Sequence, residues 1–191
     1  MNYWFLYTTA TGEIYEAPYL GNATEWTNIP EGCAVLGPID QSDPTATDAW
    51  QHPNHYAVQN GQLVKTVTDA QLLAEAQQAR IAFLDQQLTA TYNAGFTSSA
   101  TGTSITWPFD DKSQIKWNWL LSVIAAGTFP ASGVQVKDLA GNTYTITDVN
   151  VAKALCIDAQ NFYLQWDSHY HSLVQQVQAA TTVDQVDAIT W

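Results

Sequence analysis

The feature that most constrains the fold is an apolar stripe of eight residues between positions 151 and 177. The stripe consists of Val151, Leu155, Ala159, Phe162, Trp166, Tyr170, Leu173 and Val177. Steps of three or four residues match the period of an α-helix, so all these side chains share one face. A helix of about 28 residues is about 40 Å long, because each residue adds about 1.5 Å. So long a face needs a partner, which is either another helix of this chain or a helix of another subunit.

A second helical segment begins at Thr68 or Asp69 and is the simplest partner within the chain. Either side chain can cap the free N–H groups of a first helical turn. Apolar residues recur at helical spacing from Leu72 to Leu88, and Gly95 suits the left-handed residue that often follows a helix. The sequence therefore predicts an antiparallel pair of long helices, with a helical contact between subunits as the alternative.

Residues 67–191 are predicted to form a helical domain of three helices and a short terminal helix, with one inserted β-hairpin. The hairpin covers residues 133–147, where two short strand-like runs flank a turn at Ala140-Gly141-Asn142. Residues 96–109 are rich in Thr, Ser and Gly, which favours an extended chain.

Capping residues indicate where the remaining helices begin. Asp110-Asp111 precedes a helical run, residues 112–126, that Gly127 closes, and acidic side chains are favoured at a helix N-terminus. Asp148 or Asn150 can cap the long helix. The terminal helix begins around Thr182, and its apolar residues are expected to fold back onto the bundle. These residues are Val183, Val186 and Ile189.

Residues 1–66 are predicted to form a small β-rich module, which makes the whole chain an α+β protein. An aromatic run at residues 3–7, a turn and residues 13–17 suggest a hairpin. Residues 30–53 carry most of the prolines and are predicted to be rich in turns. Asn60-Gly61 lies between two short strand-like runs and favours a type I′ turn, because both central residues of that turn need positive φ.

The charge balance restricts the partners that the protein can bind. The net charge is −12, and the six basic residues are scattered singly, so a phosphate backbone or an anionic membrane surface is disfavoured. The most apolar run, residues 117–126, is too short to cross a bilayer, which takes about 20 residues. The N-terminus lacks the basic region of a signal peptide, so we expect synthesis in the cytoplasm. Cys33 and Cys156 are expected to stay separate thiols.

No set of residues predicts a catalytic or metal site. His52 and His55 flank a proline, and His169 and His171 lie about 200° apart on a helix, so neither pair is placed to chelate a metal. Asp110-Asp111 read with Asp138 and Asp148 could be paired carboxylates of a glycoside hydrolase. Their positions before helical runs favour capping instead. Asn22-Ala23-Thr24 matches a glycosylation sequon outside any secretory context. We expect no enzymatic activity, cofactor or metal.

Aromatic residues are the side chains that most suggest a partner. The chain has eight tryptophans, and an exposed tryptophan or tyrosine buries a large area at a protein contact with few rotatable bonds. Trp117 and Trp119 are two residues apart and cannot share a helical face, so one is expected in the core and one at an interface. The predicted interface residues are Trp107, Phe109, Trp117, Trp119, Phe162, Trp166, Tyr170 and Trp191.

Three motifs of the helical domain carry a family resemblance. They are Ala94-Gly95-Phe96-Thr97-Ser98-Ser99, the pair Asp110 and Gln114 at the start of a helix, and a terminus with Ala179-Ala180-Thr181-Thr182-Val183, Val186, Ile189 and Trp191. With these motifs, residues 69–191 resemble a small domain at the C-terminal end of many bacteriophage tail proteins, including fibre-associated and fibre-assembly proteins. The Trp107-Pro108-Phe109 segment departs from many of those relatives.

The resemblance implies a non-enzymatic role in the virion tail, at the baseplate or fibre. It implies contacts with other tail or fibre proteins, in a homo-oligomer, and supplies no catalytic residues. Two alternatives remain open. One is a fibre-assembly chaperone absent from the mature particle, which would expose an apolar patch as a free protein. The other is a module that binds a host-surface glycan through its tryptophans.

Overall fold

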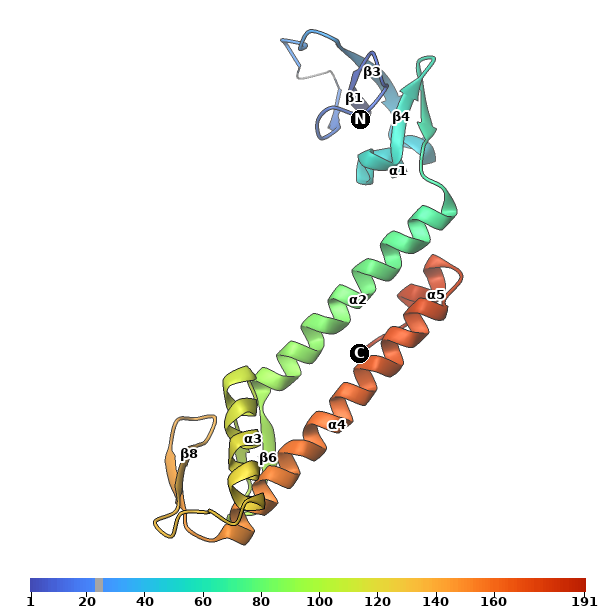
Figure 1. Ribbon diagram of the computed structural model, residues 1–191. Helices are drawn as coiled ribbons and strands as arrows, with labels where there is room; N and C mark the ends of the chain where they lie inside the picture. The colour runs from blue at the N-terminus through green and yellow to red at the C-terminus, as the bar shows by residue number, and fades with distance from the viewer. Residues whose placement is uncertain (23–25) are drawn as a thin grey trace. The chain divides into compact units, whose positions relative to one another are not determined.

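The computed structural model describes residues 1–22 and 26–191 and is an α+β protein of two compact units (Figure 1). The units are residues 1–72 and 73–191. The boundary predicted at residue 66 therefore lies a few residues earlier than the division between Leu72 and Leu73. Most of the Asn22-Ala23-Thr24 sequon lies outside the described residues.

A three-stranded antiparallel sheet forms the centre of the first unit. Strand β1 (Asn2–Thr8) lies between β2 (Tyr19–Gly21) and β3 (Cys33–Asp40). Alternating side chains of β1 enter the core, where Phe5 is fully buried and packs with residues of the helix that follows β3. The unit is thus a thin sheet covered on one face by a short helix.

The hairpin predicted from residues 3–7 and 13–17 is correct in its antiparallel pairing but wrong in its extent. Tyr7 and Ile14 form an isolated antiparallel bridge, and the Thr8 nitrogen donates to the carbonyl oxygen of Glu13 at 2.9 Å. Ile14 packs against the core, whereas Glu16 and Ala17 are exposed and lie outside any strand. Regular strand pairing joins β1 to β2 and to β3.

The prediction that residues 30–53 contain mainly turns is also wrong, because they include β3, helix α1 (Pro44–Gln51) and the single-turn helix η1 (Pro53–His55). Pro38 is accepted in β3 because β3 is an edge strand. Pro44 stands in the first turn of α1, where its missing N–H costs nothing, and the Asp43 carboxylate caps that turn at 2.9 Å from the Ala46 nitrogen.

The hairpin predicted around Asn60-Gly61 is confirmed. Strands β4 (Tyr56–Gln59) and β5 (Gln62–Lys65) pair in antiparallel register. Asn60 and Gly61 have φ values of 52° and 75°, as a two-residue type I′ turn requires. Asn60-Gly61 was sufficient to predict the hairpin, because a two-residue turn fixes which residues of β4 and β5 pair.

The second unit has the predicted helices and hairpin. Its helices are α2 (Asp69–Ala94), which begins just before the unit boundary, α3 (Asp111–Ala125), α4 (Val149–Ala179) and α5 (Val183–Asp187). Its strands are β6 (Phe96–Ser98), β7 (Ile105–Trp107), β8 (Val134–Lys137) and β9 (Thr143–Ile146). The hairpin β8–β9 matches the prediction, and the extended segment 96–109 folds into a second hairpin, β6–β7.

Helix α2 begins with a reciprocal cap between two side chains. Thr68 Oγ1 accepts from the Gln71 nitrogen at 3.3 Å, and Gln71 Oε1 accepts from the Thr68 nitrogen at 2.8 Å, which is a capping box. Asp110 caps α3 and Asp148 caps α4, each by accepting from a first-turn nitrogen. Asp148, rather than Asn150, is therefore the cap of the long helix.

The apolar stripe of α4 joins two hydrophobic clusters. Leu155, Ala159 and the partly buried Phe162 pack with α3 and the two hairpins in the first cluster. Leu173 and Val177 pack with α2 and α5 in the second. One helix face is thus shared by both cores of the unit.

Helices α2 and α4 run antiparallel, as predicted, with α5 folded back beside them (Figure 1). Near the end of α2, the Tyr92 ring lies 6.1 Å from that of Phe162. Near its start, Gln77 Nε2 donates to the carbonyl oxygen of Val177 at 3.0 Å. The partner of the α4 stripe is therefore supplied within the chain.

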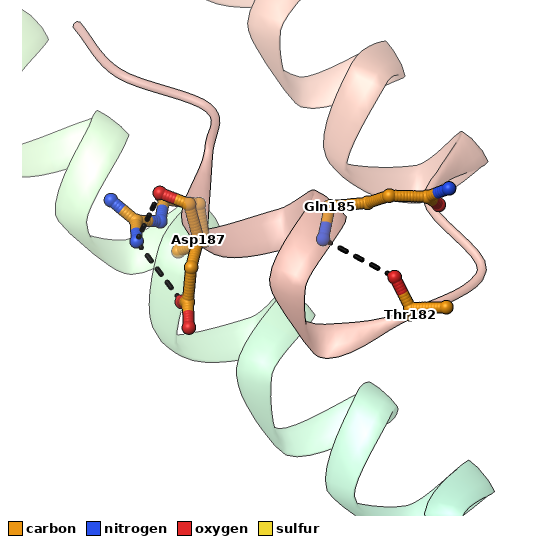
Figure 2. Close-up of polar contacts among 4 residues, drawn as sticks. Thr182, Gln185 and Asp187 are labelled. Carbon is orange, nitrogen blue, oxygen red and sulfur yellow. Dashed lines mark hydrogen bonds and ion pairs between the residues drawn. The ribbon is translucent and has the colours of Figure 1, made fainter.

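The terminal helix α5 is held by its own cap and by α2. Thr182 Oγ1 accepts from the Gln185 nitrogen at 3.3 Å, and Asp187 Oδ1 lies 3.2 Å from a guanidinium nitrogen of Arg80 (Figure 2). That ion pair is exposed on the Asp187 side, so its contribution to stability is small. Burial of Val186 between α2 and α4 is the stronger anchor.

Leu155→Ala tests the dependence of the unit on the α4 stripe. Leu155 is fully buried, so truncation should lower the free energy of unfolding by about 2–5 kcal/mol through lost burial and a cavity. Leu164→Ala is the matched control on the same helix, because Leu164 is 59% exposed, and it should change stability by less than about 0.5 kcal/mol. Equal effects in chemical denaturation would contradict the packing described.

Candidate partner-binding surface

Three of the predicted interface residues form the core of the second unit instead. Trp107, Phe109 and Trp117 are buried, and the rings of Trp107 and Trp117 meet edge to face at 6.1 Å. Trp117 Nε1 also donates to the carbonyl oxygen of Pro108 at 2.9 Å, which satisfies its polar edge. These side chains stabilise the fold, and no more than 6% of any of them is exposed.

Four further predicted residues are engaged within the chain. Trp166 and Trp191 stack at 5.6 Å with an angle of 16° between their planes, so the C-terminal residue closes over α4. Phe162 packs against the first cluster and Tyr170 against the second. All four are partly buried, which leaves only their edges accessible.

Trp119 is the predicted residue that the structure places on the surface, with 55% of it exposed. It follows Ile115, which is 69% exposed, by one helical turn on α3. Side chains four residues apart lie next to each other on a helix. Ile115 and Trp119 therefore form an apolar ridge, here named the α3 ridge, on the face of α3 opposite the core.

An amphipathic groove runs between α3 and α4, with a volume of about 440 Å³. Trp117, Cys156 and Ala159 contribute its apolar lining, and burial raises the pKa of the Cys156 thiol to about 11. Tyr163 and the exposed Leu164 also line it. Uncharged amides add polar groups: Gln114, Asn118 and Gln160.

Sequence reasoning missed Ile115, Ile157 and Leu164, which are all exposed apolar residues of α3 or α4. A signal was present, since all three fall away from the buried positions of their helices. Ile157 and Leu164 are seven residues apart and so share a second, outer stripe of α4. The outer face of an amphipathic helix is usually polar, so these two positions depart from the pattern of α4.

A second, smaller pocket of about 270 Å³ lies on the other side of α3, against the β8–β9 hairpin. It is named the α3–β8 pocket. Lys116 and Trp119 line it from α3, and all four residues of β8 line it from the opposite side. Lys137 at the end of β8 brings a second ammonium group.

The aspartates considered as paired carboxylates serve three separate local structures. Asp110 and Asp148 cap helices. Asp138 closes the β8–β9 turn by accepting from the Asn142 nitrogen at 2.7 Å and from the Tyr144 hydroxyl at 3.2 Å. The Asn142 side chain, which donates to the same carboxylate, is the main cause of the lowered pKa of Asp138. These three carboxylates therefore have structural roles, in helix capping and in closing a turn.

Each histidine is engaged in local contacts within its own unit. His52 and His55 stack at 5.2 Å in the first unit, while His169 contacts the Trp191 ring and His171 lies 3.7 Å from Asp167. Within residues 1–22 and 26–191, no group of three His, Cys, Asp or Glu side chains is placed to hold a metal ion.

The Gly95 to Ser99 motif positions the β6–β7 hairpin on α4. Ser98 is buried and its hydroxyl donates to Asp158 of α4, while Phe96 enters the first cluster. Gly95 has φ +79°, and a Cβ atom there would overlap the carbonyl oxygen of Trp107. The motif is therefore explained by close packing.

No family model, curated protein or solved structure matches this chain. Among the described residues, none of the helices combines the length and the apolar character needed to cross a membrane.

Gly95→Ala tests the structural role of the motif. Both Gly95→Ala and its control Gly102→Ala place alanine at positive φ, which costs roughly 1–2 kcal/mol. Gly102 has open space around it, whereas Gly95 faces the Trp107 carbonyl. Thermal unfolding should therefore show a larger loss of stability for Gly95→Ala, and equal losses would contradict the close approach.

Proposed function

We propose that the protein is a non-enzymatic component of a bacteriophage tail, located at the baseplate or fibre of the virion and made in the host cytoplasm. The sequence resemblance supports the tail assignment. The exposed apolar surface of α3 and α4 supports action through protein–protein contacts. The proposed partners are other tail or fibre proteins and further copies of this chain.

The observation that carries the mode of action is the exposure of Ile115, Trp119 and Leu164, each more than half accessible in the single chain. Large apolar side chains that gather beside a groove mark surfaces that another protein covers. The α3 ridge rests on a helix whose inner face is fixed in an aromatic core, so it is presented rigidly. A rigid surface limits the entropy lost on association.

A fibre-assembly chaperone is the second candidate, and the same exposed surface favours it. A chaperone needs an apolar patch that is open in the free protein and covered only while its client folds. A virion subunit would keep that patch covered permanently in the assembled tail.

Mass spectrometry of density-purified particles, from a phage that encodes the chain, separates these two roles. A tail subunit should appear at a fixed copy number relative to a known tail protein. A chaperone should be missing from particles but co-purify with a fibre from the lysate. Absence from both preparations would contradict the proposal.

The double variant Ile115→Ser and Trp119→Ser tests the α3 ridge. Both residues are exposed, so the melting temperature should hardly change while incorporation into particles or fibre complexes falls at least tenfold. Ile29→Ser with Val64→Ser is the matched control, because these are exposed apolar residues of the first unit. If both double variants assemble normally, the ridge is not the contact surface.

A further inference from the structure

The α3–β8 pocket lies along an edge of β8 to which no described strand is paired, and this edge ends where the Leu139 nitrogen donates to the carbonyl oxygen of Thr106 in β7 at 2.9 Å. In the described residues β8 pairs only with β9, and the pocket is lined by every residue of β8 but by Thr143 alone of β9. An unpaired edge presents backbone N–H and C=O groups to any strand that can approach it.

The hairpin register identifies which backbone groups are free. Asp138 donates its N–H to the carbonyl oxygen of Asn142 at 3.0 Å, which makes Lys137 and Thr143 a non-hydrogen-bonded pair. Pairs alternate along an antiparallel ladder, so Gln135 and Thr145 form another. The N–H and C=O groups of Gln135 and Lys137 therefore point away from β9.

Charge and side-chain type complement this edge. Lys116 and Lys137 line the pocket from opposite sides, and no ion pair among the described residues involves either ammonium group. The whole chain carries a net charge of −12, so two lysines at one pocket, without an ion pair among the described residues, are a local exception. Trp119 adds an exposed apolar wall beside them.

We propose that the α3–β8 pocket binds an extended acidic segment of a partner protein, which adds to β8 as a third strand. Alternate side chains of an added strand face opposite sides. Side chains on the face toward α3 would meet Trp119, Leu120 and the ammonium group of Lys116. A carboxylate on the other face would pair with Lys137. Main-chain hydrogen bonds supply affinity in such complexes, and the side-chain contacts supply selectivity.

A length of polypeptide fits this site better than an enclosed small molecule. The pocket follows a strand and is lined by all four residues of β8, so the backbone groups of β8 are spaced to bond an extended peptide. The inference deepens the proposed function, on which the identity of the partner as a tail protein rests. Binding of a peptide to the purified protein is independent of that identity.

The test uses a panel of labelled octapeptides in which two aspartates are one, three or five residues apart among valine and threonine, so that they face opposite sides of a strand. Fluorescence polarisation should detect binding by at least one of them, which weakens with added salt. The matched peptide with asparagine in place of aspartate should bind at least tenfold more weakly. The same peptide with alternate backbone nitrogens methylated should not bind, because its donors to β8 are removed.

Variants of the chain then locate the site. Lys116→Gln with Lys137→Gln should weaken binding at least tenfold, whereas Lys112→Gln with Lys153→Gln removes two lysines outside the pocket and should leave it unchanged. Gln135→Pro removes one outward donor and is tolerated at an edge strand, so it should abolish binding with little change in melting temperature. The lysine variants decide the matter if Gln135→Pro does not fold.

Several results would overturn the proposal. Failure of every peptide in the panel to bind at a peptide concentration of about 1 mM would do so. Equal binding of methylated and unmethylated peptides would exclude strand addition. Preference for an acidic oligosaccharide over every peptide would assign the pocket to sugars. If Lys137→Gln self-associates and still binds peptide, the role of Lys137 is to prevent edge-to-edge pairing of β8 with other chains, not to bind a carboxylate. If a second copy of the chain binds in preference to every peptide, the pocket is a subunit interface.

Discussion

Helix α4 is the element on which the second unit depends, because its apolar stripe is shared by two separate cores. Leu155 and Ala159 belong to the cluster with α3 and the hairpins, and Leu173 and Val177 to the cluster with α2 and α5. Two-stranded hairpins are marginal by themselves. β6–β7 and β8–β9 are therefore stable only because α3 and α4 offer an apolar surface to cover them.

The same packing decides what α3 can present to a partner. Its inner face inserts Trp117 and Leu120 into the first cluster, where aromatic rings meet mostly edge to face. The outer face, with the α3 ridge, is left with the amphipathic groove on one side and the α3–β8 pocket on the other. The proposed partner surface thus lies on a helix whose inner face is fixed in the core. The polar and charged groups around it belong to elements that pack on the same core.

Local signals predicted most of the second unit because the physics behind them is local. A cap such as Asp110 or Thr182 satisfies N–H groups within its own first turn, and Asn60-Gly61 defines its hairpin register by itself. The first unit was predicted less well, because the pairing of β1 with β3 joins residues about 30 positions apart. No local pattern indicates which distant strand gives the fuller register. Prolines were misleading for the same reason, since an edge strand or a first helical turn accepts them.

The sequence by itself determined the helices, most of their caps and the two hairpin turns, because periodicity and capping act over a few residues. It left open whether α4 pairs with α2 or with a helix of another subunit. Tertiary structure alone decided which aromatic residues are available to a partner. The sequence does not distinguish Trp117 from Trp119. Trp117 is buried and Trp119 is exposed because only one side of α3 packs on α4 and the hairpins. The free edge of β8 likewise exists only because nothing else in the described chain pairs with it. Exposure depends on contacts between distant segments, and those contacts are settled by packing.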